Sequence, residues 1–174
     1  MRRVVVWGLL LGVAILAPRG ARAQAPAALP AVDLADLNLR VAEARVVDSL
    51  ETGKTPIKPQ PGMKFVVATL RGSLKAPGHL AVAATGFYAL YSEVASNAQE
   101  KVAQAKAQAV DLGGEGTWAP QASADYKAPK QVLLEVAIPV PTPVSEFYLI
   151  YDTAKGRRRA AVNLHKGVSA AHPQ

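Results

Sequence analysis

Three histidines, His79, His165 and His172, are the residues of this chain best suited to holding a metal ion. Most metal sites can be recognised in a sequence by closely spaced ligand pairs, such as two histidines one helical turn apart. No two of these histidines have such a spacing. The chain also contains no cysteine, which excludes thiolate ligands and cysteine nucleophiles. We therefore predict no metal site and no cofactor.

The sequence also shows no arrangement of residues suited to catalysis by a serine nucleophile or by a pair of carboxylates. Neither Arg71-Gly72-Ser73 nor Gly167-Val168-Ser169 forms the G-x-S-x-G turn that exposes a nucleophilic serine between a strand and a helix. The acidic residues show no spacing that selects a catalytic pair. Glu135 stands between two apolar neighbours and is expected on the solvent face of a strand rather than as a general acid. The sequence thus predicts no catalytic residue.

Two features have the chemistry of contact residues, and each has a purely structural alternative. Arg157, Arg158 and Arg159 form the densest local charge, suited to phosphate, an acidic glycan or an anionic membrane surface. Alternatively, they belong to a solvated hairpin whose charges discourage edge-to-edge strand pairing. Trp118, beside Pro120 in an expected loop, is either a ligand-stacking or partner-anchoring residue or a cover over the end of a core.

The N-terminal 23 residues have the pattern of a secretory signal peptide. Two arginines precede an apolar run at 4–17, and an A-x-A sequence ending at Ala23 follows. A transmembrane helix is the main alternative, but the run is shorter than the roughly 20 residues needed to cross a bilayer. We predict cleavage between Ala23 and Gln24, export to a periplasm or the medium, and no stable membrane anchor afterwards.

Export changes the meaning of the net charge of +7. The four arginines of the signal peptide leave with it, so the remaining chain carries +3. Nucleic acid is not a partner to expect outside the cytoplasm, and we exclude it. Without cysteine the domain has no disulfide, so its stability depends on the core that about 150 residues can bury.

Apolar segments of strand length, separated by breaks rich in proline and glycine, predict an all-β fold. The expected strands are 37–41, 63–70, 80–82, 87–91, 131–138, 147–151 and 160–164. Phe87–Tyr91 and Phe147–Tyr151 share a pattern of aromatic and apolar residues, and would supply much of the core if they pair. The proline-rich stretch 139–143 is expected to be an extended connector or an edge.

Residues 97–110 allow two interpretations. Their helix-forming composition and the glycines that follow favour one short helix. However, Ala103, Ala105, Ala107 and Ala109 alternate with polar residues, which is the period of a strand.

Together, these segments resemble a known family. The residues on which the resemblance rests are Pro61 to Val67, Phe87 with Leu90, Val132 to Val136 continuing into Ile138-Pro139, and Phe147 to Tyr151. In this order they resemble secreted bacterial immunoglobulin-like domains related to the mycobacterial immunoprotective extracellular antigen. The resemblance implies an antiparallel immunoglobulin-like β-sandwich, a strand within 97–110, export, and no established enzymatic activity. It assigns no functional residue to this chain.

The sequence predicts four segments. Residues 1–23 are the signal peptide, 24–36 a flexible Ala/Pro-rich leader, 37–165 the immunoglobulin-like β-sandwich and 166–174 a flexible tail. The expected function is non-enzymatic binding of an envelope protein or an extracellular ligand whose identity the sequence leaves unknown. One alternative is an accessory subunit of a cell-envelope complex that uses a strand edge or the proline connector. The other is an enzyme whose site is assembled from dispersed residues.

Overall fold

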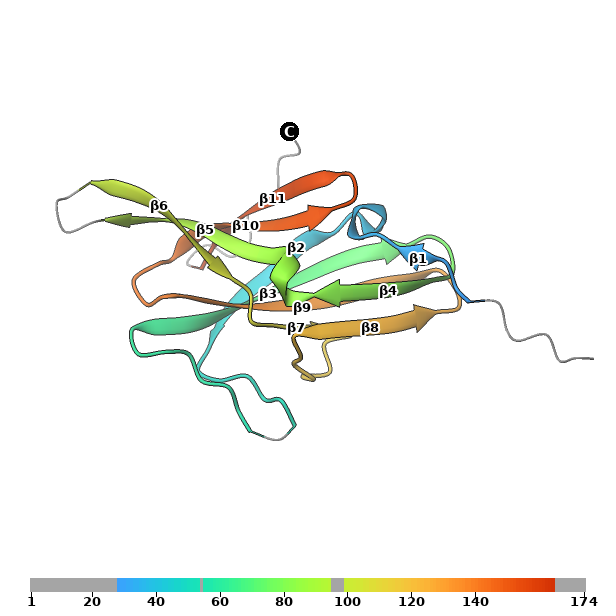
Figure 1. Cartoon of the computed structure of the whole chain (residues 1–174), viewed down its shortest axis with the longest axis horizontal. Coiled ribbons are helices and arrows are strands. Elements are labelled where there is room, and N and C mark those ends of the chain that lie inside the picture. Colours follow the sequence, from blue (N-terminus) through green and yellow to red (C-terminus); the bar gives the residue numbers. More distant parts are fainter. Residues whose placement is uncertain (1–27, 54, 95–98, 165–174) are drawn as a thin grey trace, which may run out of the picture.

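The computed structural model describes residues 28–53, 55–94 and 99–164, and these residues are mainly β-strand (Figure 1). No described helix is longer than the four-residue 3-10 turn η1. In chain order the elements are β1 (Ala31–Val32), η1 (Leu34–Leu37), β2 (Arg40–Val47), β3 (Met63–Leu74), β4 (Gly78–Ala83), η2 (Ala84–Gly86), β5 (Phe87–Val94), β6 (Glu100–Lys106), β7 (Ala109–Leu112), β8 (Gln121–Tyr126), β9 (Lys130–Pro141), β10 (Glu146–Thr153) and β11 (Gly156–Asn163).

The strands form a β-sandwich, which confirms the predicted fold class. Two four-stranded sheets have the orders β2-β3-β9-β7 and β11-β10-β5-β6, and a three-stranded sheet has the order β1-β4-β8. The main core combines Val66 and Leu134 of the first sheet with Phe87 of the second and Leu80 of the third. All four side chains are fully buried, so the three sheets share one hydrophobic interior.

The two similar aromatic segments pair with each other as neighbouring antiparallel strands, β5 and β10. Phe87 and Tyr151 are opposite each other in register, and their rings stack with centroids 5.8 Å apart. Alternate residues of a strand face opposite sides, so Tyr88 and Tyr148 point to the outer face of the same sheet. The expectation that these segments supply much of the core is confirmed.

The helix considered for residues 97–110 is wrong over the described part of that segment. Glu100–Lys106 forms β6, antiparallel to β5, and Ala109–Leu112 forms β7. Ala103 and Ala105 are half-buried against the core while Gln104 is exposed. Burial of alternate alanines and pairing with β5 outweigh the helix propensity of the segment.

The proline-rich stretch after Ile138 was expected to be an extended connector or an edge, and this is partly wrong. β9 continues through Pro139 to Pro141 and is a central strand of its sheet. The prolines are tolerated because β9 is paired on one side only at this point. Pro139 lies opposite Phe65 of β3, whereas β7 pairs with β9 only as far as Ala137. A proline without an N–H therefore removes no ladder bond on the open side.

The expected flexible leader differs from the structure in its C-terminal part. Ala31–Val32 forms β1, parallel to β4, and Asp33 caps η1 by accepting the Ala35 N–H at 2.7 Å. Close approach at Gly78 allows this docking, since a Cβ there would lie 2.2 Å from Val32 Cγ2.

Several sequence predictions lie outside the described residues. They are the signal peptide with its cleavage site at Ala23 and Gln24, the first residues of the leader, and the tail at 166–174. Within the described ranges, no helix has the length and apolar character to span a membrane.

Candidate functional site

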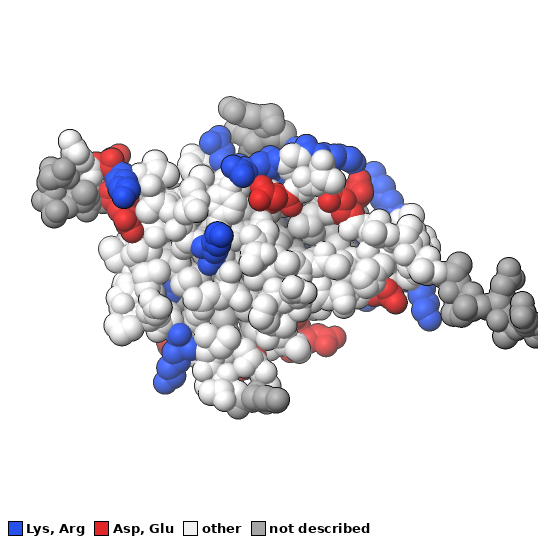
Figure 2. Space-filling view, in the orientation of Figure 1, with Lys and Arg blue, Asp and Glu red and all other residues white. Residues whose placement is uncertain are grey.

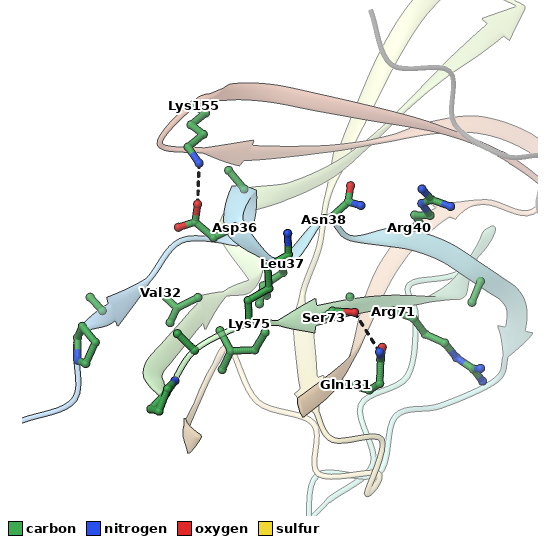
Figure 3. Close-up of a pocket in the computed structure, with 18 residues that line it drawn as sticks. Val32, Asp36, Leu37, Asn38, Arg40, Arg71, Ser73, Lys75, Gln131 and Lys155 are labelled. Carbon is green, nitrogen blue, oxygen red and sulfur yellow. Dashed lines mark hydrogen bonds and ion pairs between the residues drawn. The ribbon is translucent and has the colours of Figure 1, made fainter. Parts of the chain in front are cut away.

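A groove of about 930 Å³ lies where β1 and η1 pass over the ends of β2 and β3 (Figure 3). Its wall on one side is β1 and η1, and on the other the turn between β3 and β4. The apolar part of the lining includes Val32, Leu74 and Pro77. This is the size of a site for a small ligand or a few units of a polymer.

Positive charge dominates the groove. Four cations, Arg40, Arg71, Lys75 and Lys155, line it together with a single acid, Asp36. Lys155 Nζ donates to Asp36 Oδ1 at 2.6 Å, and this hydrogen bond holds the pKa of Asp36 below its ordinary value. Asp36 therefore stays ionised and neutralises Lys155.

The other three cations, Arg40, Arg71 and Lys75, have no ion-pair partner among the described residues. Arg40 and Arg71 are direct cross-strand partners on β2 and β3. Like charges in such positions repel one another, and Figure 3 shows the two guanidinium groups pointing apart. Negative charge bound at the groove would lessen this repulsion.

Uncharged polar groups accompany the cations. Asn38 ends η1 in a left-handed conformation, with φ of 49°, which asparagine tolerates better than most residues. Gln131 Nε2 donates to Ser73 Oγ at 3.0 Å across β9 and β3. The groove thus offers amide and hydroxyl groups next to its charges, the combination that binds the hydroxyls and acid groups of a sugar.

Sequence reasoning missed this groove. Arg40 is distant in the chain from Arg71 and Lys75, and it lies beside Arg71 only through the register of β2 and β3. One local signal was available at Gly72, where a Cβ would lie 2.6 Å from the backbone oxygen of Leu37. A glycine inside a strand often marks such a close approach of another segment.

The predicted arginine run does not form one patch. Arg157 and Arg159 lie on the outer face of the β11-β10-β5-β6 sheet, over the rings of Tyr88 and Tyr148 at 5.5 Å and 4.7 Å. Arg157 Nε also donates to Asp152 at 3.0 Å. Figure 2 shows Lys and Arg side chains along the upper edge of the molecule, where β10 and β11 lie, with acidic side chains beside them.

Arg158 is exposed as well, but it lies opposite Tyr151, whose side chain faces the core. The run is therefore divided between two faces of β11, as strand alternation requires. Trp118 is only 8% exposed and packs with Leu50, Phe65 and Val67 in a second hydrophobic cluster. Trp118 covers the outer face of β3 and β9. Because its ring is buried, it offers no surface on which a ligand could stack.

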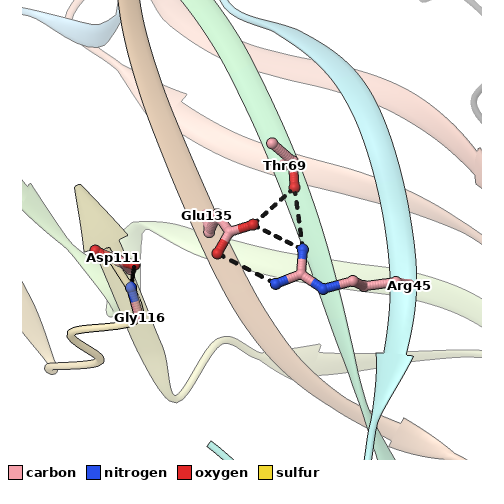
Figure 4. Close-up of polar contacts among 5 residues, drawn as sticks. All are labelled: Arg45, Thr69, Asp111, Gly116 and Glu135. Carbon is pink, nitrogen blue, oxygen red and sulfur yellow. Dashed lines mark hydrogen bonds and ion pairs between the residues drawn. The ribbon is translucent and has the colours of Figure 1, made fainter. Parts of the chain in front are cut away.

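Glu135 is not on a solvent face as expected, but is 8% exposed (Figure 4). Arg45 donates to it through both terminal nitrogens, at 2.7 Å and 3.3 Å, and the Thr69 hydroxyl at 3.0 Å. Burial alone would raise the pKa of Glu135, but these bonds hold it below the ordinary value. Its carboxylate is thus fully occupied in joining β2, β3 and β9.

Asp111 lies beside this network, opposite Glu135 on β7, and is 1% exposed. Its Oδ2 accepts the Gly116 N–H at 2.6 Å, which ties down the loop after β7. Burial is the main reason that its pKa is raised, and the negative charge of Glu135 adds to the effect. Two carboxyls with opposite pKa shifts resemble an acid-base pair, but neither lines the groove.

The raised pKa of Asp111 predicts that this residue lowers the stability of the fold as the pH rises. A carboxyl with a raised folded pKa contributes stability below its ordinary pKa, and that contribution is lost as the pH rises through the folded value. Asp111→Asn removes this titration. We expect the free energy of unfolding of this variant, relative to that of the wild type, to rise as the pH increases above the ordinary carboxyl pKa of about 3.9. Urea unfolding at several pH values measures this, and a difference that stays constant with pH would contradict it.

The described histidine, His79, contacts Asp125 at 2.6 Å between β4 and β8, while His165 and His172 lie outside the described residues. Within the described ranges no group of three or more histidines and acids is placed to hold a metal ion. Comparisons with protein-family models, with curated proteins and with solved structures find no match to this chain.

Proposed function

We propose that this chain is an exported, non-enzymatic binding domain whose groove takes an anionic ligand. The observation that carries the proposal is the set of three uncompensated cations, Arg40, Arg71 and Lys75, around one groove. Lys155, the fourth cation of the groove, is paired with Asp36, and outside the groove Arg45 and Arg157 each have an acidic partner. Export is supported by the N-terminal sequence pattern, and it places the domain among extracellular or periplasmic molecules.

An acidic glycan fits the lining better than a bare inorganic anion. Its carboxylates or sulfates would pair with the cations, and its hydroxyls would bond to Asn38, Ser73 and Gln131. The apolar wall at Val32 and Pro77 would contact the faces of the sugar rings. The volume of the groove and its mixed chemistry suit a few residues of such a polymer.

A paired ligand panel tests this proposal. Calorimetric titration with oligogalacturonate, a polymer of carboxylated sugars, is compared with titration of its neutral methyl ester. We expect binding of the acidic form, weakened by salt because surface charges are screened, and little binding of the ester. Equal affinity for the two forms, or an affinity independent of salt, would contradict the proposal.

A second candidate is an accessory subunit of an envelope complex, for which the outer face of the β11-β10-β5-β6 sheet offers a contact surface. Tyr148 is 45% exposed there, with Arg159 stacked upon it. Tyrosine and arginine are the residues that most often anchor protein interfaces. Capture of one stoichiometric envelope protein, lost on Tyr148→Ala, would favour this candidate over the glycan. The immunoglobulin-like relationship and the dispersed-site enzyme both stay predictions.

A further inference from the structure

The outer edge of β6 is an open strand edge with a distinctive charge pattern. Among the strands that the structure describes, β6 is the last of its sheet and pairs only with β5. It lies in the β5–β6 hairpin, which projects from the body of the sandwich (Figure 1). Val102 at its centre is 71% exposed, more than any other large hydrophobic residue described. An edge of this kind offers free backbone groups for pairing with another strand.

The backbone pattern shows which residues of β6 offer those groups. The Ala107 N–H donates to the Phe87 oxygen at 2.9 Å, so Ala107 directs its backbone groups toward β5. Direction alternates along an antiparallel strand. Glu100, Val102, Gln104 and Lys106 therefore direct their N–H and C=O groups away from β5, toward the open edge.

We propose that β6 pairs antiparallel with β6 of a second copy, around a two-fold axis at Ala103. In this register Glu100 lies opposite Lys106 of the other copy, and Val102 opposite its Gln104. All four residues with outward backbone groups are used, and two pairs of opposite charge form by symmetry. Moving the axis to residue 102 or 104 breaks both charge pairs.

The side chains agree with this register. Val102 and Val102 of the second copy become diagonal neighbours on the outer face, where each covers the exposed surface of the other. On the inner face the two-fold axis passes between alanines, which offer no steric obstacle. The result is one continuous sheet with the order β11-β10-β5-β6-β6-β5-β10-β11. Both grooves, built on other strands, remain open in this dimer.

Charge reversal with rescue tests the proposal. Sedimentation velocity of the wild type is expected to show a monomer–dimer equilibrium. Glu100→Lys and Lys106→Glu should each weaken dimerisation by about tenfold, since like charges then face each other twice. The double variant restores opposite charges and should recover the wild-type dissociation constant. A purely monomeric wild type, or a double variant no better than the singles, would overturn the proposal.

Crosslinking tests the register itself. Ala103 would face its own copy in the pair type whose Cα atoms are about 4.5 Å apart, within reach of a disulfide. The chain has no other cysteine, so mild oxidation of Ala103→Cys should give a covalent dimer. Ala161→Cys on β11, the opposite edge strand of the sheet, is the matched control and should stay monomeric. Equal crosslinking of the two variants would exclude the β6 register.

Discussion

Reversing the three free cations of the groove, with Arg40→Glu, Arg71→Glu and Lys75→Glu together, is expected to abolish binding of an acidic glycan. A hydrogen bond to a charged group contributes about 1.5 kcal/mol or more, so the loss of three, about 4.5 kcal/mol, corresponds to roughly 1,000-fold or more in affinity. All three side chains are exposed, and the fold should be unaffected. Calorimetric titration with oligogalacturonate measures the loss, and circular dichroism checks the fold.

The control is a second triple variant with the same change in net charge. Lys58→Glu, Lys127→Glu and Arg158→Glu replace exposed cations that do not line the groove. Binding that depends on the groove should survive these changes with little loss. If both triple variants lose affinity equally, the attraction comes from net charge and the groove is not the site.

Phe87→Ala is expected to destabilise the protein by about 4 kcal/mol, the usual cost of removing a fully buried aromatic ring. Phe87 is 0% exposed and stacks on Tyr151 inside the main core. The midpoint of urea unfolding should fall while its slope stays constant. This loss is a large part of the stability of an ordinary domain.

Tyr88→Ala, at the next position of β5, is the matched control. Its ring lies on the outer face beneath Arg157, where a cation–π contact contributes about 0.5 to 1 kcal/mol. We expect a cost far below that of Phe87→Ala. Equal costs for the two variants would contradict the assignment of the inner and outer faces of this sheet.

The central strands of the sandwich were predictable from their residues. Met63–Leu70 and Gln131–Ile138 are rich in β-branched residues, and they became the paired strands β3 and β9. The aromatic segments of β5 and β10 were equally clear. In these segments local preference and tertiary packing agree, which is why the pattern alone predicts them.

Other elements depend on contacts that no local pattern records. β1 is a strand only because Gly78 lets Val32 approach, although its composition is that of a leader. Glu135 is buried because a second hydrophobic cluster, which includes Trp118, lies on the outer face of its sheet. A strand flanked by water on one face was expected, and this face is instead covered.

The groove was beyond prediction for a similar reason. Arg40 and Arg71 become neighbours through the pairing of β2 with β3, and an irregularity between Val41 and Glu43 shifts that register. The arginine run, in contrast, was conspicuous in the sequence but is divided between two faces of β11. Charge density along a chain is therefore a poor guide to charge density on a β-sheet surface.

Mapping a bound acidic glycan onto the backbone tests whether the groove is the binding site. Amide chemical shifts of the isotope-labelled protein are followed by NMR as oligogalacturonate is added. We expect the perturbed amides to cluster around the groove, at Asn38, Arg40 and Ser73, with the outer face at Tyr148 and Arg159 unchanged. Perturbation centred on Tyr148 and Arg159, with no change at the groove, would show that the ligand binds elsewhere.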